Sequence, residues 1–176
     1  MIPMKQLLLI LALMELVGCG ETPTNWNWVS DPSDPNNVKV ERQIRGAIKK
    51  PTGELTKADL EKVTYLYLSI NQLTSVKCLE KLTQLTEVNL TRNQLTSVKG
   101  LENLTQLKEL DLYKNQLTDV KGLENLTQLK ELSLIGNQLT EVPKGLEKLT
   151  KLKDLYLIGN QLTSVKGLEK LRSWRC

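Results

Sequence analysis

The sequence contains no histidine and no phenylalanine, and aromatic residues make up only 4% of its 176 residues. Without histidine, serine and threonine hydroxyls lack their usual activating base, and the common zinc-binding sets lack one of their ligands. The three cysteines, Cys19, Cys78 and Cys176, lie too far apart for a disulfide framework or a metal-binding pair. No glycine-rich phosphate-binding loop occurs. These absences predict a protein that is not an enzyme and that has no cofactor and no metal.

The sequence also lacks a strong excess of either positive or negative charge. The 24 lysine and arginine residues are interleaved with 20 aspartate and glutamate residues, which leaves a net charge of +4. This mixture is typical of a solvated surface and argues against a nucleic-acid partner. Hydrophobic residues make up 40% of the chain and are mostly leucine and valine, which indicates a core built from one repeated packing unit.

Residues 1–18 have the layout of a secretory signal peptide, with Lys5 as the positive charge before the apolar run 7–14. The run is too short to span a bilayer, which takes about 20 residues. The following segment, 16–19, reads Leu-Val-Gly-Cys and resembles the lipobox of bacterial lipoproteins. The resemblance implies that Cys19 is lipidated and becomes the first residue of the mature chain, which anchors the protein to a membrane. A plain signal peptide with a chance cysteine is the alternative.

The residue after Cys19 is Gly20, which resembles the default for outer-membrane sorting. We therefore expect a lipid-anchored protein of the bacterial cell envelope, on the outer rather than the inner membrane. Residues 19–37 are predicted to be a tether, because prolines stand among polar residues without an apolar period. Trp26 and Trp28 in this tether either dock on the domain, lie at a membrane surface or belong to a disordered spacer.

A repeat of about 22 residues fills most of the remaining chain. Its asparagines are Asn71, Asn93, Asn115, Asn137 and Asn160, at intervals of 22, 22, 22 and 23 residues. The frame around one of them reads Leu107-x-x-Leu110-x-Leu112-x-x-Asn115-x-Leu117. This pattern resembles the leucine-rich-repeat family over residues 63–171, and its spacing is similar to the internalin-type class. The resemblance implies an α/β solenoid, a right-handed coil with a concave parallel β-sheet, short 3-10 or helical segments on the convex side and an N-terminal helical cap.

The frame has a physical explanation. Leu110 and Leu112 point inward from a short strand because side chains alternate along a strand. The asparagine is expected inside the following bend, where it bonds backbone groups that otherwise have no partner. Glycines at 100, 122, 145 and 167 let the chain turn toward the far side. Cys78 takes this place in the first coil and is therefore predicted to be a small packing residue. The extra residue of the fourth interval falls in the outer loop, so the strand register is expected to survive.

Both ends of a solenoid expose apolar edges that need a cover. At the front, residues 38–62 are predicted to form a cap, with helical spacing of apolar residues over 40–48. Thr56 with Asp59 resembles a capping box for a second short helix. At the back, residues 172–176 stop where a further strand should begin, with Trp174 in the place of Leu152. Either this end is truncated or its open edge meets a partner, self-association included.

Three columns of side chains are predicted to face outward from the sheet. They are Tyr65, Glu87, Glu109, Glu131 and Asp154; Tyr67, Asn89, Asp111, Ser133 and Tyr156; and Ser69, Thr91, Tyr113, Ile135 and Ile158. We expect the ligand-binding residues among them, with the small residues Ser69, Thr91 and Ser133 left out. Residues 101–110 and 123–132 are identical, and the main differences between these coils fall at positions 111, 113 and 114 against 133, 135 and 136. Either this face was diversified for binding, which we favour, or the substitutions fell there by chance.

The first column is an acidic ladder whose like charges repel, with Lys108, Lys130 and Lys153 beside it as candidates for compensation. A solvated face and a site for basic ligands are equal alternatives. Near the C-terminal end, we expect an exposed apolar group of the kind found at interface hot spots, left uncovered by Gly136 and Gly159. Its members are Tyr113, Ile135, Tyr156 and Ile158.

Together these features predict a non-enzymatic binding module, a membrane-anchored envelope lipoprotein that presents its repeat surface to a protein, peptide or glycan ligand. The alternative is a structural or truncated fragment of a longer repeat protein with no ligand of its own.

Overall fold

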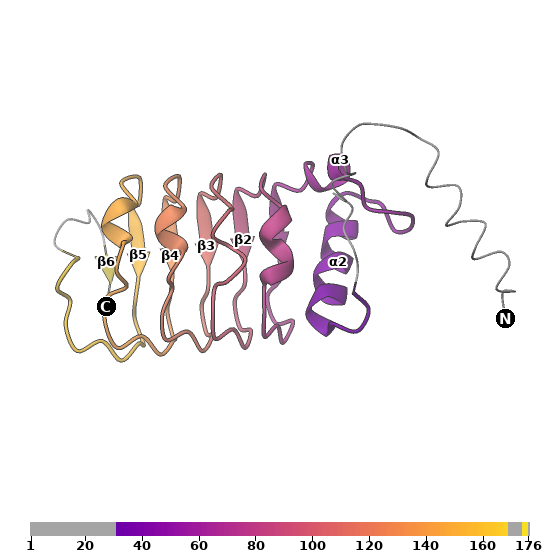
Figure 1. Cartoon of the computed structure of the whole chain (residues 1–176). Helices are drawn as coiled ribbons and strands as arrows, with labels where there is room; N and C mark the ends of the chain where they lie inside the picture. The colour runs from indigo at the N-terminus through magenta and orange to yellow at the C-terminus, as the bar shows by residue number, and fades with distance from the viewer. Residues whose placement is uncertain (1–30, 169–173, 176) are drawn as a thin grey trace, which may run out of the picture.

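The computed structural model describes residues 31–168 together with Trp174 and Arg175. It shows a row of stacked coils with a helical cap at one end (Figure 1). The predicted signal peptide, the lipidation site Cys19 and the two tryptophans of the tether lie outside the described residues. Within the described part of the chain, no helix is long and apolar enough to cross a membrane.

Each coil contributes one short strand to a single parallel sheet. In spatial order the strands are β1 (Tyr65–Tyr67), β2 (Glu87–Asn89), β3 (Glu109–Asp111), β4 (Glu131–Ser133), β5 (Asp154–Tyr156) and β6 (Trp174–Arg175). Equivalent positions pair, so Glu109 lies between Glu87 and Glu131. The extra residue of the fourth interval leaves this register intact, because Glu131 pairs with Asp154. The predicted solenoid with a parallel sheet is confirmed.

The C-terminal end differs from the expectation. Residues 172–176 were expected to stop short of a further strand, but Trp174 and Arg175 form β6 beside β5. In this strand pair, Trp174 lies opposite Leu155. The 22-residue spacing would instead place Trp174 opposite Leu152. The sheet therefore extends one strand beyond the asparagine-containing repeats.

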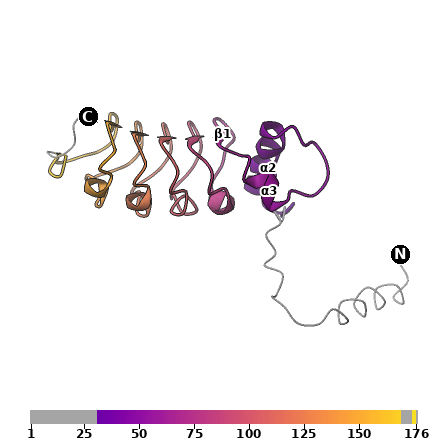
Figure 2. The same cartoon turned by 90° about the horizontal axis from the view of Figure 1, so that it is seen from above.

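The side of the coils opposite the sheet is made of short turns. Three coils form 3-10 helices there, namely η1 (Lys77–Lys81), η2 (Leu123–Asn125) and η3 (Leu146–Lys148). The second coil has turns but no 3-10 helix at the equivalent place, residues 99–103. Viewed from above, the strands line one long side of the molecule and the turns line the other (Figure 2). The two sides enclose the core between them.

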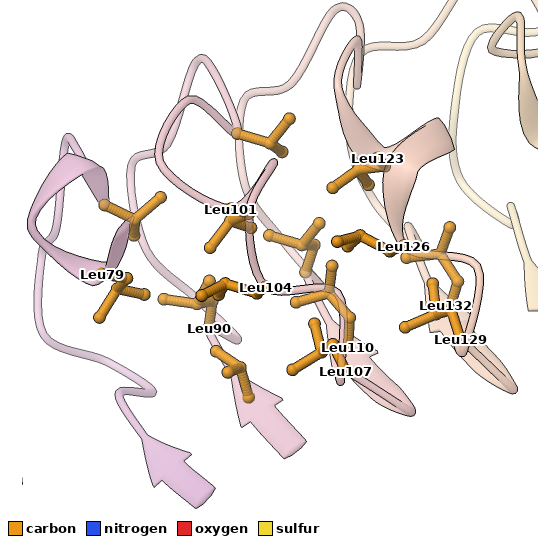
Figure 3. Close-up of a cluster of buried hydrophobic side chains, with 14 of the residues drawn as sticks. Leu79, Leu90, Leu101, Leu104, Leu107, Leu110, Leu123, Leu126, Leu129 and Leu132 are labelled. Atoms are coloured by element: carbon orange, nitrogen blue, oxygen red, sulfur yellow. The ribbon is translucent and has the colours of Figure 1, made fainter. Parts of the chain in front are cut away.

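The core is a stack of leucines that repeats from coil to coil. Leu101, Leu104 and Leu107 are fully buried, and so are their equivalents 22 residues later. Figure 3 shows the two sets side by side between the strands and the outer turns. Burying one such side chain contributes roughly 1.5–3 kcal/mol. Because each set packs on the next, every coil depends on its neighbours for stability.

The front edge of the stack is covered by α2 (Pro35–Ala47) and α3 (Lys57–Leu60). Helix α2 begins at Asp34, whose carboxylate accepts a hydrogen bond from the Asn36 N–H at 2.9 Å. Its inner face is formed by Val40 and Ile44, which are completely buried in the same core. The predicted cap therefore contains helices that pack on the first coil, but α2 begins at Pro35, within the segment 19–37 that was predicted to be a tether.

Helix α3 begins with the predicted capping box. The Thr56 hydroxyl accepts a hydrogen bond from the Asp59 N–H at 3.3 Å, and the Asp59 carboxylate accepts one from the Thr56 N–H at 3.1 Å. The ammonium group of Lys50 also donates to this carboxylate at 2.6 Å. The Lys50 bond, followed by the Thr56 bonds, holds the pKa of Asp59 well below its usual value.

Candidate functional site

The three outward columns predicted from the sequence lie side by side on the sheet, because the register pairs their members from coil to coil. We call the surface that they form the strand face. Burial alternates along each strand, so that Tyr65 and Tyr67 are exposed while Leu66 between them is buried. A shallow hollow of about 350 Å³ lies at its centre, and Glu109 and Glu131 are part of its lining.

Four carboxylates of the first column form an acidic row across adjacent strands. They are Glu87, Glu109, Glu131 and Asp154. Partial burial raises the pKa of Glu131, and the negative charges of Glu109, Asp154 and Asp111 raise it further. The expected compensation by Lys108, Lys130 and Lys153 is not found. Among the described residues, every ion pair lies in the cap region between residues 41 and 62.

An aromatic group lies at the N-terminal end of the strand face. Tyr65 is 47% exposed and Tyr67 is 52% exposed, and their ring centroids are 5.7 Å apart. The Tyr67 hydroxyl donates a hydrogen bond to the Glu87 carboxylate at 2.8 Å, which raises the pKa of Tyr67. Ile70, in the bend that follows the same strand, is 68% exposed. The two tyrosines fall in separate columns of the repeat and Ile70 falls in none of them, so the repeat pattern did not predict this group.

The middle column is partly occupied by hydrogen bonds within the sheet. The Asp111 carboxylate accepts from the Thr91 hydroxyl and from the Tyr113 N–H, each at 2.9 Å. The side-chain oxygen of Asn89 accepts from the Thr91 N–H at 3.0 Å. Both side chains therefore support the bend after their own strand as well as facing outward.

The apolar group predicted near the C-terminal end is less exposed than expected. Ile158 is 45% exposed, but Tyr113, Ile135 and Tyr156 are half-buried. Neighbouring side chains shield part of this group from solvent. The Lys114 ammonium, for example, lies 5.2 Å from the centre of the Tyr113 ring. Ile135 and Tyr156 also line the central hollow. Two of the four side chains therefore line the hollow, and only Ile158 remains exposed.

The repeated asparagines occupy the bends and join neighbouring coils. The Asn115 side-chain oxygen accepts from the Leu95 N–H of the preceding coil at 3.1 Å. Its amide group donates to the carbonyls of Leu90, also in the preceding coil, at 3.1 Å and of Leu112 at 3.0 Å. Asn93, Asn137 and Asn160 make the same set of contacts. Each of these asparagines thus satisfies backbone groups in two coils.

Asn71 does not share this geometry, because no repeat precedes it. It is half-buried, and its amide donates to the Ser69 carbonyl of its own coil at 3.0 Å. The cap supplies a different contact. The side-chain oxygen of the buried Asn36 in α2 accepts from the Thr74 N–H at 2.9 Å. One asparagine of the cap therefore joins the first coil to the helix that covers it.

The residue before each repeated asparagine has a left-handed backbone. Its φ is +57° at Ile70, +54° at Arg92, +52° at Lys114, +67° at Gly136 and +73° at Gly159. The two glycines, which the sequence analysis interpreted as gaps beside the apolar group, adopt this conformation without steric cost. A β-branched residue adopts it rarely, so Ile70 carries backbone strain. The missed residue could have been noticed in the sequence as the single aliphatic side chain at this repeat position.

The turn toward the outer side also needs glycine in the later coils. Gly100 has φ +106°, and a Cβ atom there would lie 2.5 Å from the Lys77 Cα. Cys78, the equivalent residue of the first coil, lies inside η1 and is not among the residues with positive φ. Its thiol is half-buried against the core, and burial raises its pKa from 9.0 to about 12. A thiol in this state is a poor nucleophile.

The described residues contain no cluster of three or more histidine, cysteine or acidic side chains that could hold a metal ion. The strand face instead offers separate carboxylates, hydroxyls and aromatic rings, arranged over adjacent strands. Such an arrangement can bind a ligand by charge, hydrogen bonding and apolar contact.

Comparisons with known proteins show which family the repeats resemble. A model described as leucine-rich repeats (2 copies) matches residues 61–103, 83–125, 105–144 and 127–170, which is more than half of the chain. No protein with a curated description matches the sequence.

Several solved structures are similar to this chain. An internalin from Listeria monocytogenes is 30% identical, with a TM-score of 0.72, over 80% of this chain and 44% of that chain. A leucine-rich-repeat protein from Leptospira interrogans is 37% identical, with a TM-score of 0.60, over 65% of this chain and 31% of that one. The ectodomain of an Arabidopsis thaliana membrane receptor kinase, in complex with Casparian strip integrity factor 2, is 33% identical with a TM-score of 0.53, over 59% of this chain and 13% of that one.

The chain therefore spans less than half the length of each of these structures. The family match and the stacked coils nevertheless agree on residues 61–168, where frame, sheet and asparagine contacts all repeat. The chain belongs to the leucine-rich-repeat family.

Proposed function

We propose that this protein is a non-enzymatic binding module of the bacterial cell envelope. Lipidated Cys19 anchors it to a membrane, the outer rather than the inner one, and the strand face recognises a protein, peptide or glycan ligand. Leucine-rich-repeat domains are typically protein-interaction modules. The similar Arabidopsis receptor ectodomain, solved in complex with another protein factor, supports this type of role.

The observation that carries the proposal is the composition of the strand face. Large aromatic side chains and carboxylates are presented to solvent around a hollow of about 350 Å³. A repeat that needed only to fold has no use for exposed rings such as Tyr65 and Tyr67. Exposed aromatic residues are enriched at protein interfaces because they bury a large area with few rotatable bonds.

The test uses the tagged full-length chain to capture ligands from envelope extract. The double change Tyr65→Ser and Tyr67→Ser, and separately Tyr113→Ser and Ile158→Ser, should weaken capture at least tenfold, since hot-spot residues contribute about 2 kcal/mol or more each. The exposed pair should leave the melting temperature nearly unchanged, whereas the half-buried Tyr113 makes the second pair slightly less stable. A ligand captured equally well by both variants would place the binding surface elsewhere.

The matched control is a pair of changes on the far side of the coils, Gln106→Ser and Gln128→Ser. These changes should leave capture unaltered, and melting should change little, because the only side-chain hydrogen bond lost among the described residues is the exposed one from Lys151 to Gln128. If no version of the chain captures a ligand, the alternative of a structural fragment without a ligand is favoured.

The anchor is tested separately, by incorporation of labelled fatty acid in a bacterial host. Cys19→Ser should abolish incorporation and leave the chain unprocessed or soluble. Cys78→Ser is the matched control and should be labelled like the unchanged protein. Labelling that persists in Cys19→Ser contradicts the lipoprotein assignment.

A further inference from the structure

The strand face concentrates negative charge in a protein whose net charge is +4. The four carboxylates of the acidic row occupy equivalent positions on β2, β3, β4 and β5. Adjacent parallel strands are about 4.8 Å apart, so the row extends over about 14 Å. Asp111, in the neighbouring column, adds a fifth negative charge at the edge of the same hollow.

Between residues 31 and 168, no lysine or arginine forms an ion pair with a carboxylate of the row. Among the described residues, the ion pairs are confined to the cap region. Lys108, Lys130 and Lys153 are exposed one position before their strands. The pKa of Glu131 is nevertheless raised, first by desolvation and then by its acidic neighbours. Like charges held at strand spacing destabilise a sheet. The fold therefore keeps an unfavourable arrangement that a cationic partner would relieve.

The geometry of the row favours several separate cations over one metal ion. Metal sites need at least three ligands that converge on one point, and no such cluster exists in the part of the chain that the structure describes. Carboxylates spaced along a line instead match a series of ammonium or guanidinium groups, each of which pairs with one or two oxygens.

The aromatic group lies at one end of the row. Tyr65 is in register with Glu87, and the Tyr67 hydroxyl holds the Glu87 carboxylate at 2.8 Å. Tyrosine rings attract cations to their faces, and the aliphatic stems of lysine and arginine pack well against apolar surface. At this end of the row, the two tyrosine rings and the Glu87 carboxylate therefore all favour lysine and arginine side chains.

We propose that the strand face binds a protein segment rich in lysine and arginine, whose cationic groups lie along the acidic row and whose stems contact Tyr65 and Tyr67. This inference rests on the proposed binding function and specifies the chemistry of the partner. Ile70, three residues after Tyr67 in the chain, is also exposed and offers an apolar side chain at the same end of the sheet.

The test measures binding of a fluorescently labelled peptide of alternating lysine and serine to the full-length chain. Its counterpart replaces every lysine by glutamate. The lysine peptide should bind, the glutamate peptide should not, and added salt should weaken the binding because exposed charges are screened. The double variant Glu109→Gln and Glu131→Gln should reduce affinity about tenfold, since two charge-assisted contacts are lost. Its melting temperature should stay equal or rise, because like charges are removed from the row.

The matched control carries the same change of charge on the outer turns, Glu80→Gln in η1 and Glu147→Gln in η3. It should keep the affinity of the unchanged protein within about twofold. Equal losses in the two double variants would show a general charge effect and overturn the proposal, as would equal binding of the glutamate peptide. If the lysine peptide fails to bind while Tyr65→Ser with Tyr67→Ser still abolishes capture of a ligand, this inference is wrong but the binding function stands. A captured glycan whose binding is unaffected by Glu109→Gln and Glu131→Gln also overturns it.

Discussion

Replacing Asn115 by alanine should lower the free energy of unfolding by about 2–6 kcal/mol, and the contacts of the side chain give this range. The Leu95 N–H loses its acceptor, and an orphaned buried donor costs about 1–3 kcal/mol. The carbonyls of Leu90 and Leu112 each lose one of two side-chain donors, because Asn93 and Asn137 still bond them. Each of these losses costs about 0.5–1.5 kcal/mol.

Two other substitutions serve as controls for Asn115→Ala. Asn71→Ala removes a single bond, to the Ser69 carbonyl, at a half-buried site and should cost less than about 1 kcal/mol. Gln116→Ala changes an exposed side chain beside Asn115 and should cost little. Urea unfolding measures all three, and the midpoint should shift without a change in the slope m. Equal costs at Asn71 and Asn115 would refute the argument, because the expected difference rests on the burial of Asn115 and on its bonds to a preceding coil.

Three further changes test other parts of the fold. Ile70→Gly should raise the free energy of unfolding by about 1 kcal/mol in urea unfolding, because glycine adopts φ +57° without strain. Gly100→Ala should lower it by about 3 kcal/mol, since the new Cβ meets the Lys77 backbone, and a loss below about 1 kcal/mol contradicts this clash. Cys78 should react with thiol reagents at about pH 8 only as fast as its coil opens. Because folding raises its pKa to about 12, stability should decrease as the pH rises from 9 toward 12.

The positions of strands β1 to β5 and of the core follow from the sequence alone, since the same leucine frame recurs and each leucine must be buried. The buried places of Asn93, Asn115 and Asn137 follow for the same reason, because a polar residue in an apolar frame needs backbone partners. The cap helices were predicted from helical spacing and from the pair Thr56 and Asp59.

The rest of the candidate site depends on neighbours that a repeat pattern does not specify. Tyr113 belongs to an outward column, but Lys114 lies against its ring, so its exposure could not be read from its position. Asn71 matches the asparagine pattern but has no preceding coil to bond. The strain at Ile70 is a property of the backbone, and only comparison with Gly136 and Gly159 at the same repeat position hints at it.

The asparagine contacts have a direction, and this direction bears on how the chain is made. The Leu95 N–H is satisfied by Asn115, and the Leu117 N–H by Asn137, so each coil receives its buried partner from the coil synthesised after it. At 5–20 residues per second, a ribosome adds the roughly 22 residues of the next coil in about 1–4 s. During that interval the last coil to emerge has unsatisfied backbone groups and an open leucine edge. A growing chain therefore becomes stable from the N-terminal cap onward, with its newest coil always incomplete until the next one is translated.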